Sequence, residues 1–306
     1  MRKLLRSLTI AVTSSMTAKR PPLWVDTDAG FDDLVALSAL ATERRLAVVS
    51  TTSGACETPE AGAGRVATIL NACGRSDVTV VAGASAPRVP VKPWLTDAQK
   101  MLLRWFADRS LGAASGPFDG DVGGAVAALG AVDLLCLGPL TNVAAVLASG
   151  RVTVETAIAM GGDAPGREPE FNFACDPAAA ATVVKTCPSL TLVGLDVCTD
   201  AFAETTELPG IIGSLCSADA CAARYDPLAA FCASREGSFE IRDVSYGVDA
   251  AGRVVAGESR VRAATRLVDR EAYLGWLRTA AAALPRANNH KTKLTRPRGH
   301  RCLSTR

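Results

Sequence analysis

Short apolar runs recur along the chain and predict the strands of a sheet. Six runs, rich in β-branched residues, span 23–27, 46–51, 78–83, 132–138, 156–161 and 190–196. Helix-like stretches lie between most of them, at 32–44, 60–73, 140–148 and 177–186. Alternating strands and helices are typical of βαβ units, whose strands lie parallel and are covered on both faces. We therefore predict an α/β fold with a single open, mostly parallel sheet and helices on both faces.

Two later segments depart from this alternation. Residues 84–120 are proline- and glycine-rich and contain Trp94 and Trp105, so we predict a loop with a helix there, as in a lid. Residues 239–268 alternate between apolar and polar positions and predict a hairpin, and 270–283 predict a closing helix. No linker is visible, and we expect one domain over residues 21–285.

Charge is distributed unevenly along the chain. The formal net charge is +2, but residues 1–20 and 286–306 together carry twelve Lys and Arg residues and no acid, which leaves −10 for the stretch between. Because the basic residues lie on the ends, a nucleic-acid partner is not expected. We interpret both ends as disordered basic tails.

Ten scattered cysteines without a CxxC pair indicate buried thiols in a reducing compartment. No apolar run has the length of a membrane span, so no membrane association is expected. The first 20 residues are compatible with a mitochondrial presequence, but we favour a cytoplasmic protein with a frayed N-terminus.

Four carboxylates crowd into the segment WVDTDAGFDDLVAL at 24–37. Asp26 and Asp28 face one side at the end of the first predicted strand, Gly30 permits a tight turn, and Asp32 and Asp33 open the next helix. Like charges this close raise one another's pKa unless a cation lies among them. Both histidines, His290 and His300, are in the tail, so the ligands on offer are hard oxygens that suit Ca²⁺ or Mg²⁺ rather than zinc.

Six segments together resemble the inosine–uridine-preferring nucleoside hydrolase family over about residues 22–283. They are DTDAGFDD (26–33), LGPLTNVA (137–144), AMGG (159–162), EFNFACDPAAA (170–180), LVGLDV (192–197) and YDPLAAF (225–231). The first has the family's DxDxGxDD pattern, and the last stands where the family typically has HDPLA.

The resemblance implies a Rossmann-like nucleoside hydrolase fold and an enzyme that hydrolyses the N-glycosidic bond of ribonucleosides, with purine nucleosides slightly favoured. It implies a Ca²⁺ cofactor and a nucleoside as the small-molecule partner, in a homodimer or homotetramer. By position, the calcium ligands would be Asp28, Asp33, Asp226 and the backbone carbonyl of Leu137. Asp28 would also accept the proton of the attacking water, while Asp32, Glu170 and Asn172 would bind the ribose.

The chain departs from the family pattern at several positions. Tyr225 replaces the usual histidine, so the departing base would need another partner: either Trp94 and Trp105 stack on it with Tyr225 beneath, or Tyr225 donates its phenolic proton. Cys56 in TTSGAC replaces an asparagine, and the family's other ribose asparagine has no clear counterpart near Asp163 or Ala164.

Two rival interpretations remain open. These losses are compatible with a catalytically weak or inactive relative that still binds calcium and a nucleoside. The DTD segment also matches the nucleophile motif of aspartyl-phosphate phosphatases. That reading needs a later lysine, however, and the body offers only Lys92, Lys100 and Lys185.

Overall fold

The computed structural model describes residues 20–284 except 44, 110, 112–113, 115, 117, 119 and 201–207. The predicted tails at 1–20 and 286–306, apart from Arg20, therefore lie outside the described residues.

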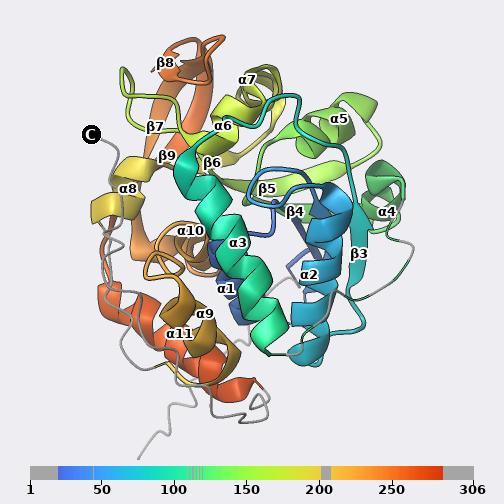
Figure 1. Cartoon of the computed structure of the whole chain (residues 1–306). Coiled ribbons are helices and arrows are strands. Elements are labelled where there is room, and N and C mark those ends of the chain that lie inside the picture. Colours follow the sequence, from blue (N-terminus) through green and yellow to red (C-terminus); the bar gives the residue numbers. More distant parts are fainter. Residues whose placement is uncertain are drawn as a thin grey trace, which may run out of the picture.

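A single sheet of nine strands in the order β3-β2-β1-β4-β5-β6-β9-β7-β8 forms the centre of the described part (Figure 1). Its strands are β1 (Leu23–Thr27), β2 (Leu46–Thr51), β3 (Thr79–Ala82), β4 (Ala131–Cys136), β5 (Thr153–Met160), β6 (Leu190–Val193), β7 (Phe239–Val248), β8 (Val254–Ala256) and β9 (Ser259–Leu267). All pairs from β3 to β9 along this order are parallel, whereas β7 pairs antiparallel with both β8 and β9. The predicted open, mostly parallel sheet with a C-terminal hairpin is confirmed.

Eleven α-helices and one 3₁₀ turn lie among the described residues. The helices are α1 (Phe31–Leu40), α2 (Pro59–Ala72), α3 (Pro93–Asp108), α4 (Val122–Ala127), α5 (Thr141–Ser149), α6 (Phe171–Cys175), α7 (Pro177–Thr186), α8 (Leu195–Asp200), α9 (Gly210–Ala218), α10 (Asp226–Ser234) and α11 (Arg270–Ala283), and the 3₁₀ turn is Glu236–Ser238. The predicted excursion contains α3, and the closing helix is α11.

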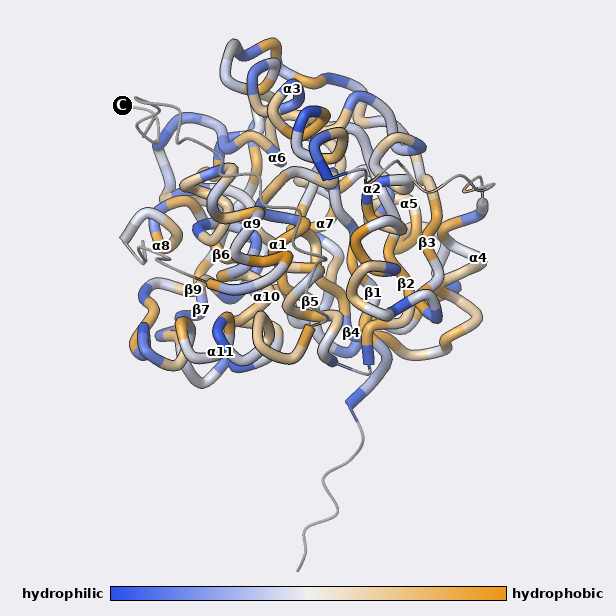
Figure 2. The backbone as a smooth tube through the Cα atoms, turned by 60° about the horizontal axis from the view of Figure 1, so that its bottom comes forward, coloured by the Kyte–Doolittle hydropathy of each residue, from blue (hydrophilic) through white to orange (hydrophobic). Residues whose placement is uncertain are grey.

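The central strands β1, β2, β4 and β6 are buried on both faces of the sheet. Successive residues of a strand point to opposite sides. Val25 and Leu135 belong to one apolar cluster, which α1, α9, α10 and α11 also build. Trp24 and Leu134 belong to a second cluster, to which α5 and α7 contribute. Apolar positions accordingly dominate the backbone along the central strands (Figure 2). The three-layer arrangement explains why these strands read as almost continuous hydrophobic runs.

Several short helices were not predicted. The run at 190–196 was expected to be a strand throughout, but β6 ends at Val193 and α8 begins at Leu195. Helices α6, α9 and α10 are five to nine residues long, too short for a helical hydrophobic period to repeat. None of the described helices combines the length and the apolar composition that crossing a bilayer requires.

Most of the described cysteines are buried thiols, as predicted from their apolar neighbours, whereas Cys221 is disulfide-bonded, which was not predicted. Seven of them are buried free thiols: Cys56, Cys73, Cys136, Cys175, Cys187, Cys198 and Cys232.

Candidate active site and metal centre

The acidic segment lies at the carboxyl edge of the parallel strands, where open α/β sheets bind ligands. Asp28 directly follows β1, and Asp32 and Asp33 occupy the first turn of α1. The turn between them has its left-handed residue at Ala29, with φ of 57°. Gly30, predicted to permit the turn, has an extended backbone instead. A Cβ there would lie 3.1 Å from Ala55 and from oxygens of both helix carboxylates, so a larger residue than Gly30 would crowd all three side chains.

Local hydrogen bonds fix the orientation of two of these carboxylates. Asp33 accepts hydrogen bonds from the Thr27 hydroxyl and, at 3.0 Å, from the backbone N–H of Gly30. Asp28 accepts one from the backbone N–H of Ala55 at 2.8 Å. A Cβ at Gly54 would lie 2.1 Å from an Asp28 oxygen. The loop after β2 therefore packs directly against the Asp28 carboxylate.

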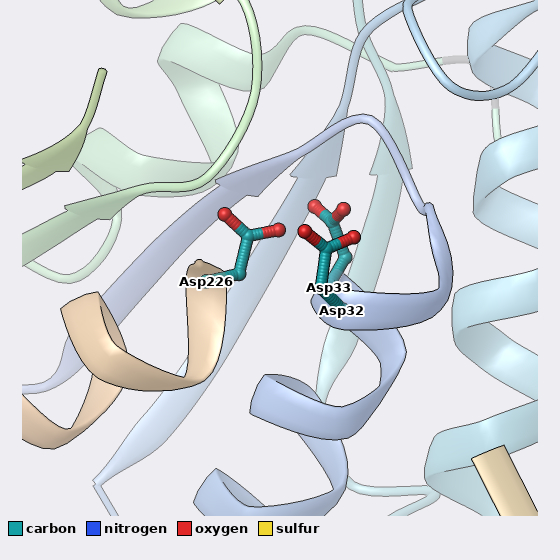
Figure 3. Close-up of side chains that lie close together, drawn as sticks. All are labelled: Asp32, Asp33 and Asp226. Atoms are coloured by element: carbon teal, nitrogen blue, oxygen red, sulfur yellow. The ribbon is translucent and has the colours of Figure 1, made fainter. Parts of the chain in front are cut away.

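Asp226, almost two hundred residues later in the chain, joins this group from the first turn of α10. Oxygen atoms of Asp32, Asp33 and Asp226 all lie within 4.8 Å of one another, and the carboxylates point toward one another (Figure 3). Asp28 lies beside Asp33, whose charge acts directly on it. The tertiary structure thus brings two of the predicted carboxylate ligands, Asp33 and Asp226, together with Asp32, which was predicted to bind ribose. Asp28, the third predicted carboxylate ligand, neighbours Asp33 but is not among the three residues within 4.8 Å.

Asp28, Asp32, Asp33 and Asp226 form a carboxylate cluster. Its environment strongly disfavours the ionised form of these side chains. Asp28, Asp33 and Asp226 have exposed fractions of 4%, 1% and 2%. Burial first, and the neighbouring carboxylates second, raise the pKa values of Asp28, Asp32 and Asp226 well above the ordinary range. No Lys or Arg among the described residues forms an ion pair with any of the four. The cluster therefore fits a divalent cation with oxygen ligands.

Leu137 and Asn172 meet at the end of β4. The Leu137 N–H donates to the Asp26 carbonyl at 2.7 Å, which continues the β1–β4 pairing to the edge of the cluster. The Leu137 carbonyl, a predicted calcium ligand, accepts a hydrogen bond from the Asn172 side chain at 3.1 Å. Asn172 thus holds that carbonyl in place.

Glu170 and Asn172, which were predicted to bind the ribose, lie at the start of α6, which begins at Phe171. Glu170 is the N-cap of this helix. Its carboxylate accepts hydrogen bonds from the N–H groups of Asn172 (2.8 Å), Phe173 (3.1 Å) and Gly162 (3.2 Å). These three hydrogen bonds fix the Glu170 carboxylate at the start of α6.

Asp26 was counted among the crowded carboxylates but was given no specific role, and Asn142 was not predicted as a functional residue. Asp26 is fully buried behind the cluster and accepts hydrogen bonds from Ser50 and, at 2.9 Å, from the Asn142 amide. Burial is the main reason that its pKa rises to about 7. Asn142 lies inside the segment LGPLTNVA, so the motif was visible, but nothing in one sequence shows that its amide reaches the first strand.

Cys56 and Tyr225, the two residues that replace the family's asparagine and histidine, both lie next to members of the carboxylate cluster in the chain or through a hydrogen bond. The Cys56 sulfur is buried and lies 3.3 Å from the Thr52 carbonyl and 3.2 Å from the Thr58 carbonyl. Its own N–H donates to the Asp28 carbonyl at 3.0 Å. Tyr225 is the half-buried residue immediately before α10, next to Asp226.

The predicted sandwich of Trp94 and Trp105 around one base is excluded. Both lie on α3, eleven residues and hence about 16 Å apart along the axis. Trp105 has an exposed fraction of 3% and packs in the core cluster with Leu102 and Phe106. Trp94 is 39% exposed, and its ring meets Phe171 edge-on at 5.4 Å. Only Trp94 therefore lies beside the predicted ribose-binding segment.

Comparison with known proteins agrees with this geometry. Residues 23–289 match the family model for inosine-uridine preferring nucleoside hydrolases. A pyrimidine-specific ribonucleoside hydrolase of Shewanella woodyi is 33% identical over 202 residues, which cover 58% of this chain and 60% of the relative. A non-specific ribonucleoside hydrolase of Escherichia fergusonii is 30% identical over 196 residues, covering 60% of this chain and 64% of the relative. The chain thus spans less than two thirds of the length of these relatives.

Solved structures show the same fold at low sequence identity. A purine-preferring ribonucleoside hydrolase from Gardnerella vaginalis aligns with a TM-score of 0.68 at 19% identity and covers 85% of this chain and 98% of its own. The type III effector XopQ, complexed with adenosine diphosphate ribose, aligns with a TM-score of 0.62 at 17% identity and covers 88% and 96%. The family match covers most of the chain and includes every member of the carboxylate cluster. The chain therefore belongs to the inosine-uridine preferring nucleoside hydrolase family.

Proposed function

We propose that this chain hydrolyses the N-glycosidic bond of ribonucleosides, giving free base and ribose, with the help of a calcium ion. The observation that carries the proposal is the meeting of Asp226 with Asp32 and Asp33, which creates a buried group of anions in need of a cation. Family membership and the activities named for the relatives support the reaction type.

The ligands we propose are Asp28, Asp33, Asp226 and the Leu137 carbonyl. All are hard oxygen donors, and the mixture of carboxylates with a backbone carbonyl suits the larger coordination shell of calcium better than that of magnesium. When bound, such an ion neutralises the carboxylates and polarises oxygen atoms of the water and the sugar.

Asp28 is the general base in this proposal. Ala55 and Gly54 hold its carboxylate in one orientation, as a positioned proton acceptor requires. Asp32 is the least buried member of the carboxylate cluster, and it is therefore the carboxylate best placed for the ribose hydroxyls.

Negative charge at this edge of the sheet suits the reaction itself. As the bond to the base breaks, the ribose gains oxocarbenium character, and nearby carboxylates stabilise that positive charge. Asn172 contributes indirectly, because it orients the Leu137 carbonyl.

Base preference is a separate question. The resemblance implied a slight bias toward purines, but a sandwich of the base between Trp94 and Trp105 is excluded by the geometry of α3. The relatives named above include pyrimidine-specific and non-specific hydrolases. We therefore propose that both purine and pyrimidine nucleosides are substrates, with Trp94 and Phe171 as the aromatic pair nearest to the base.

A reducing-sugar assay across inosine, adenosine, guanosine, uridine and cytidine, with calcium and after exhaustive EGTA treatment, tests the function. We expect ribose release with calcium, loss of release with EGTA, and recovery when calcium is restored. Binding of nucleosides without any ribose release would instead support the catalytically inactive relative.

The Asp28→Asn variant is the matched test of the general base. It keeps the shape of the side chain, and we expect a loss of turnover of roughly 10²- to 10⁴-fold with an unchanged circular dichroism spectrum. Asp97→Asn, an exposed position on α3, serves as the control. Turnover of Asp28→Asn equal to that of this control would remove Asp28 as the base.

A further inference from the structure

The segment that leads into α3 runs along the short helix α6, beside the candidate site (Figure 1). At the end of α6, the Cys175 carbonyl accepts a hydrogen bond from the Arg88 N–H at 3.2 Å. At the start of α6, the Phe171 ring meets the Trp94 ring, with 5.4 Å between the ring centres. Residues 88–94, which we name the rim segment, are therefore held at both ends of α6.

Two cations of the rim segment, Arg88 and Lys92, have no carboxylate partner among the described residues. Neither side chain forms an ion pair there. Arg88 is exposed and Lys92 is half-buried, with its ammonium 5.7 Å from the centre of the Trp94 ring. Guanidinium and ammonium groups carry only hydrogen-bond donors, so both side chains can offer these donors to an anionic ligand.

The charges of both side chains reach the residues of α6 and its cap. Burial raises the pKa of the Glu170 carboxyl, whereas its three backbone hydrogen bonds and the Lys92 charge lower it. Burial, and then the charges of Asp28 and Glu170, raise the pKa of the Cys175 thiol. The charges of Lys92 and Arg88 lower it. Carboxylates of the site and cations of the rim segment therefore lie around the same short helix.

The shape of a nucleoside decides which of its groups lies near these cations. In a β-ribonucleoside, the 2′ and 3′ hydroxyls lie on one face of the ribose ring, and the base and the 5′ carbon lie on the other. With the hydroxyls held by the carboxylate cluster, as proposed above, the base and the 5′ group both point away from it. Trp94 and Phe171 are the aromatic pair nearest to the base in that proposal, so the 5′ group also lies on the side of the rim segment.

We propose that Arg88 and Lys92 bind a phosphate group on the 5′ oxygen, so that ribonucleoside 5′-monophosphates are the preferred substrates of this site. The inference rests on the proposed N-glycosidic hydrolysis and names its substrate class. Arginine and lysine are the side chains that commonly bind phosphate. Two cations at this position also offset the repulsion between a phosphate and the carboxylate cluster.

The bond changes remain those of the proposed function. A water oxygen forms a bond to the anomeric carbon while the bond from that carbon to the base nitrogen breaks, and the electron pair leaves with the base. One water proton passes to Asp28 and then to solvent, and the base takes up one proton. The products are the free base and ribose 5-phosphate, and the phosphate ester itself is unchanged.

Three substrates with one base test the preference: inosine, inosine 5′-monophosphate and inosine 3′-monophosphate. The last has its phosphate on the opposite side of the ribose and controls for charge alone. Release of the free base by the calcium-loaded protein gives kcat/KM for each. We expect kcat/KM for the 5′-monophosphate to exceed that for inosine by roughly 10- to 100-fold, as hydrogen bonds between charged groups allow, and we expect no gain for the 3′-monophosphate.

Single substitutions in the rim segment test the two cations. Lys92→Met and Arg88→Met should each lower kcat/KM for the 5′-monophosphate by roughly 10-fold, with kcat/KM for inosine within about twofold of wild type. Lys92→Arg keeps the charge and should retain most of the preference. Lys100→Met, which removes an exposed cation further along α3, is the matched control and should behave as wild type. Thermal unfolding of each variant reports whether the fold is retained.

Binding of the sugar product gives a readout that does not depend on turnover. Calorimetric titrations compare ribose 5-phosphate with ribose, and we expect the phosphate to bind more tightly in the wild type and in Lys100→Met. Lys92→Met should lose most of this difference. Potassium chloride should weaken binding of ribose 5-phosphate more than that of ribose, because salt screens charges that are exposed or half-buried.

Other outcomes would overturn the inference. Hydrolysis of inosine with an equal or lower kcat/KM for the 5′-monophosphate would refute the phosphate site and leave the proposed function in place. Equal losses on both substrates in Lys92→Met and Arg88→Met would show that the two cations only offset the carboxylate cluster. A protein that hydrolyses none of the three compounds would refute the proposed function, while tighter binding of ribose 5-phosphate than of ribose would still support the phosphate site.

Discussion

At the scale of single residues, burial distinguishes side chains that look equivalent in the sequence. Trp94 and Trp105 lie on one helix, yet Trp94 is partly exposed at the edge of the candidate site and Trp105 is in the core. Asp26 and Asp28 end one strand, yet Asp26 is tied to Ser50 and Asn142 while Asp28 faces the carboxylate cluster. The residue type alone therefore does not determine the role.

The two tryptophans give a prediction at this scale. Trp105→Ala should lower the free energy of unfolding by about 3–5 kcal/mol, because it leaves a large cavity in the core. Trp94→Ala should cost no more than about 1.5 kcal/mol, the value of an aromatic contact. Chemical denaturation measures both. A Trp105→Ala protein as stable as the Trp94→Ala protein would show that Trp105 is not a core residue.

At the scale of elements, the candidate site depends on how helix N-termini meet strand ends. Helices α1 and α10 both begin at the carboxyl edge of the sheet, and each places acidic residues in its first turn. Positive partial charge at helix N-termini favours these acids, but it does not neutralise four of them.

Asn142, on the first turn of α5, joins several strand ends. Its side-chain NH2 group donates to the Asp26 carboxylate in β1 and to the Thr51 carbonyl of β2 (3.0 Å). Its side-chain oxygen accepts from the Ala84 N–H, just beyond β3 (2.8 Å). At Gly83, a Cβ would lie 2.4 Å from the Asn142 side chain. One buried amide thus fixes the spacing of three neighbouring strand ends behind the carboxylate cluster.

Asn142→Ala should therefore lower the free energy of unfolding by about 1–3 kcal/mol, because buried polar groups lose their partners. It should also weaken calcium binding, since Asp26 and the strand that carries Asp28 lose a support. Denaturation and calcium titration measure the two effects, with Asn71→Ala on the exposed side of α2 as control. An Asn142→Ala protein that matches this control would leave the amide without a structural role.

At the scale of the whole molecule, the carboxylate cluster couples stability to pH and to the cation. Asp26 and three members of the cluster have pKa values raised by burial. In the metal-free protein, the native state then binds more protons than the unfolded state above about pH 4. Stability must fall as pH rises through the native pKa values.

We therefore predict that the metal-free protein is less stable at pH 8 than at pH 5, and that calcium stabilises it more at pH 8. Calcium requires ionised carboxylates, so its binding competes with their protonation. For Asp26 alone, with a native pKa of about 7, the contribution is at most about 4 kcal/mol.

Denaturant unfolding at pH 5, 6, 7 and 8, with calcium and with EGTA, measures this dependence. Asp26→Asn, which removes one titrating group, should flatten the slope of the metal-free protein. Metal-free stability that is constant or rises over this range would contradict the buried anionic cluster.

Much of the fold and of the site was readable from the sequence. The apolar runs predicted the parallel sheet, since strands buried on both faces must be apolar at nearly every position. The DxDxGxDD segment predicted three members of the carboxylate cluster, because they are neighbours along the chain, whereas the fourth, Asp226, was predicted only from the family resemblance. Short helices such as α6 and α10 were missed, since five to nine residues give no repeated period.

What the sequence alone determined is therefore local: which runs are buried, and where acids collect after the first strand. The family resemblance had implied that Asp226 joins Asp28 and Asp33, but only the tertiary structure showed which distant groups meet there. It placed Asp226 against Asp33, gave Asn142 to Asp26, and separated Trp105 from the site. Each of these contacts joins residues far apart in the chain, and their meeting depends on the packing of whole helices on the sheet, which no local pattern encodes.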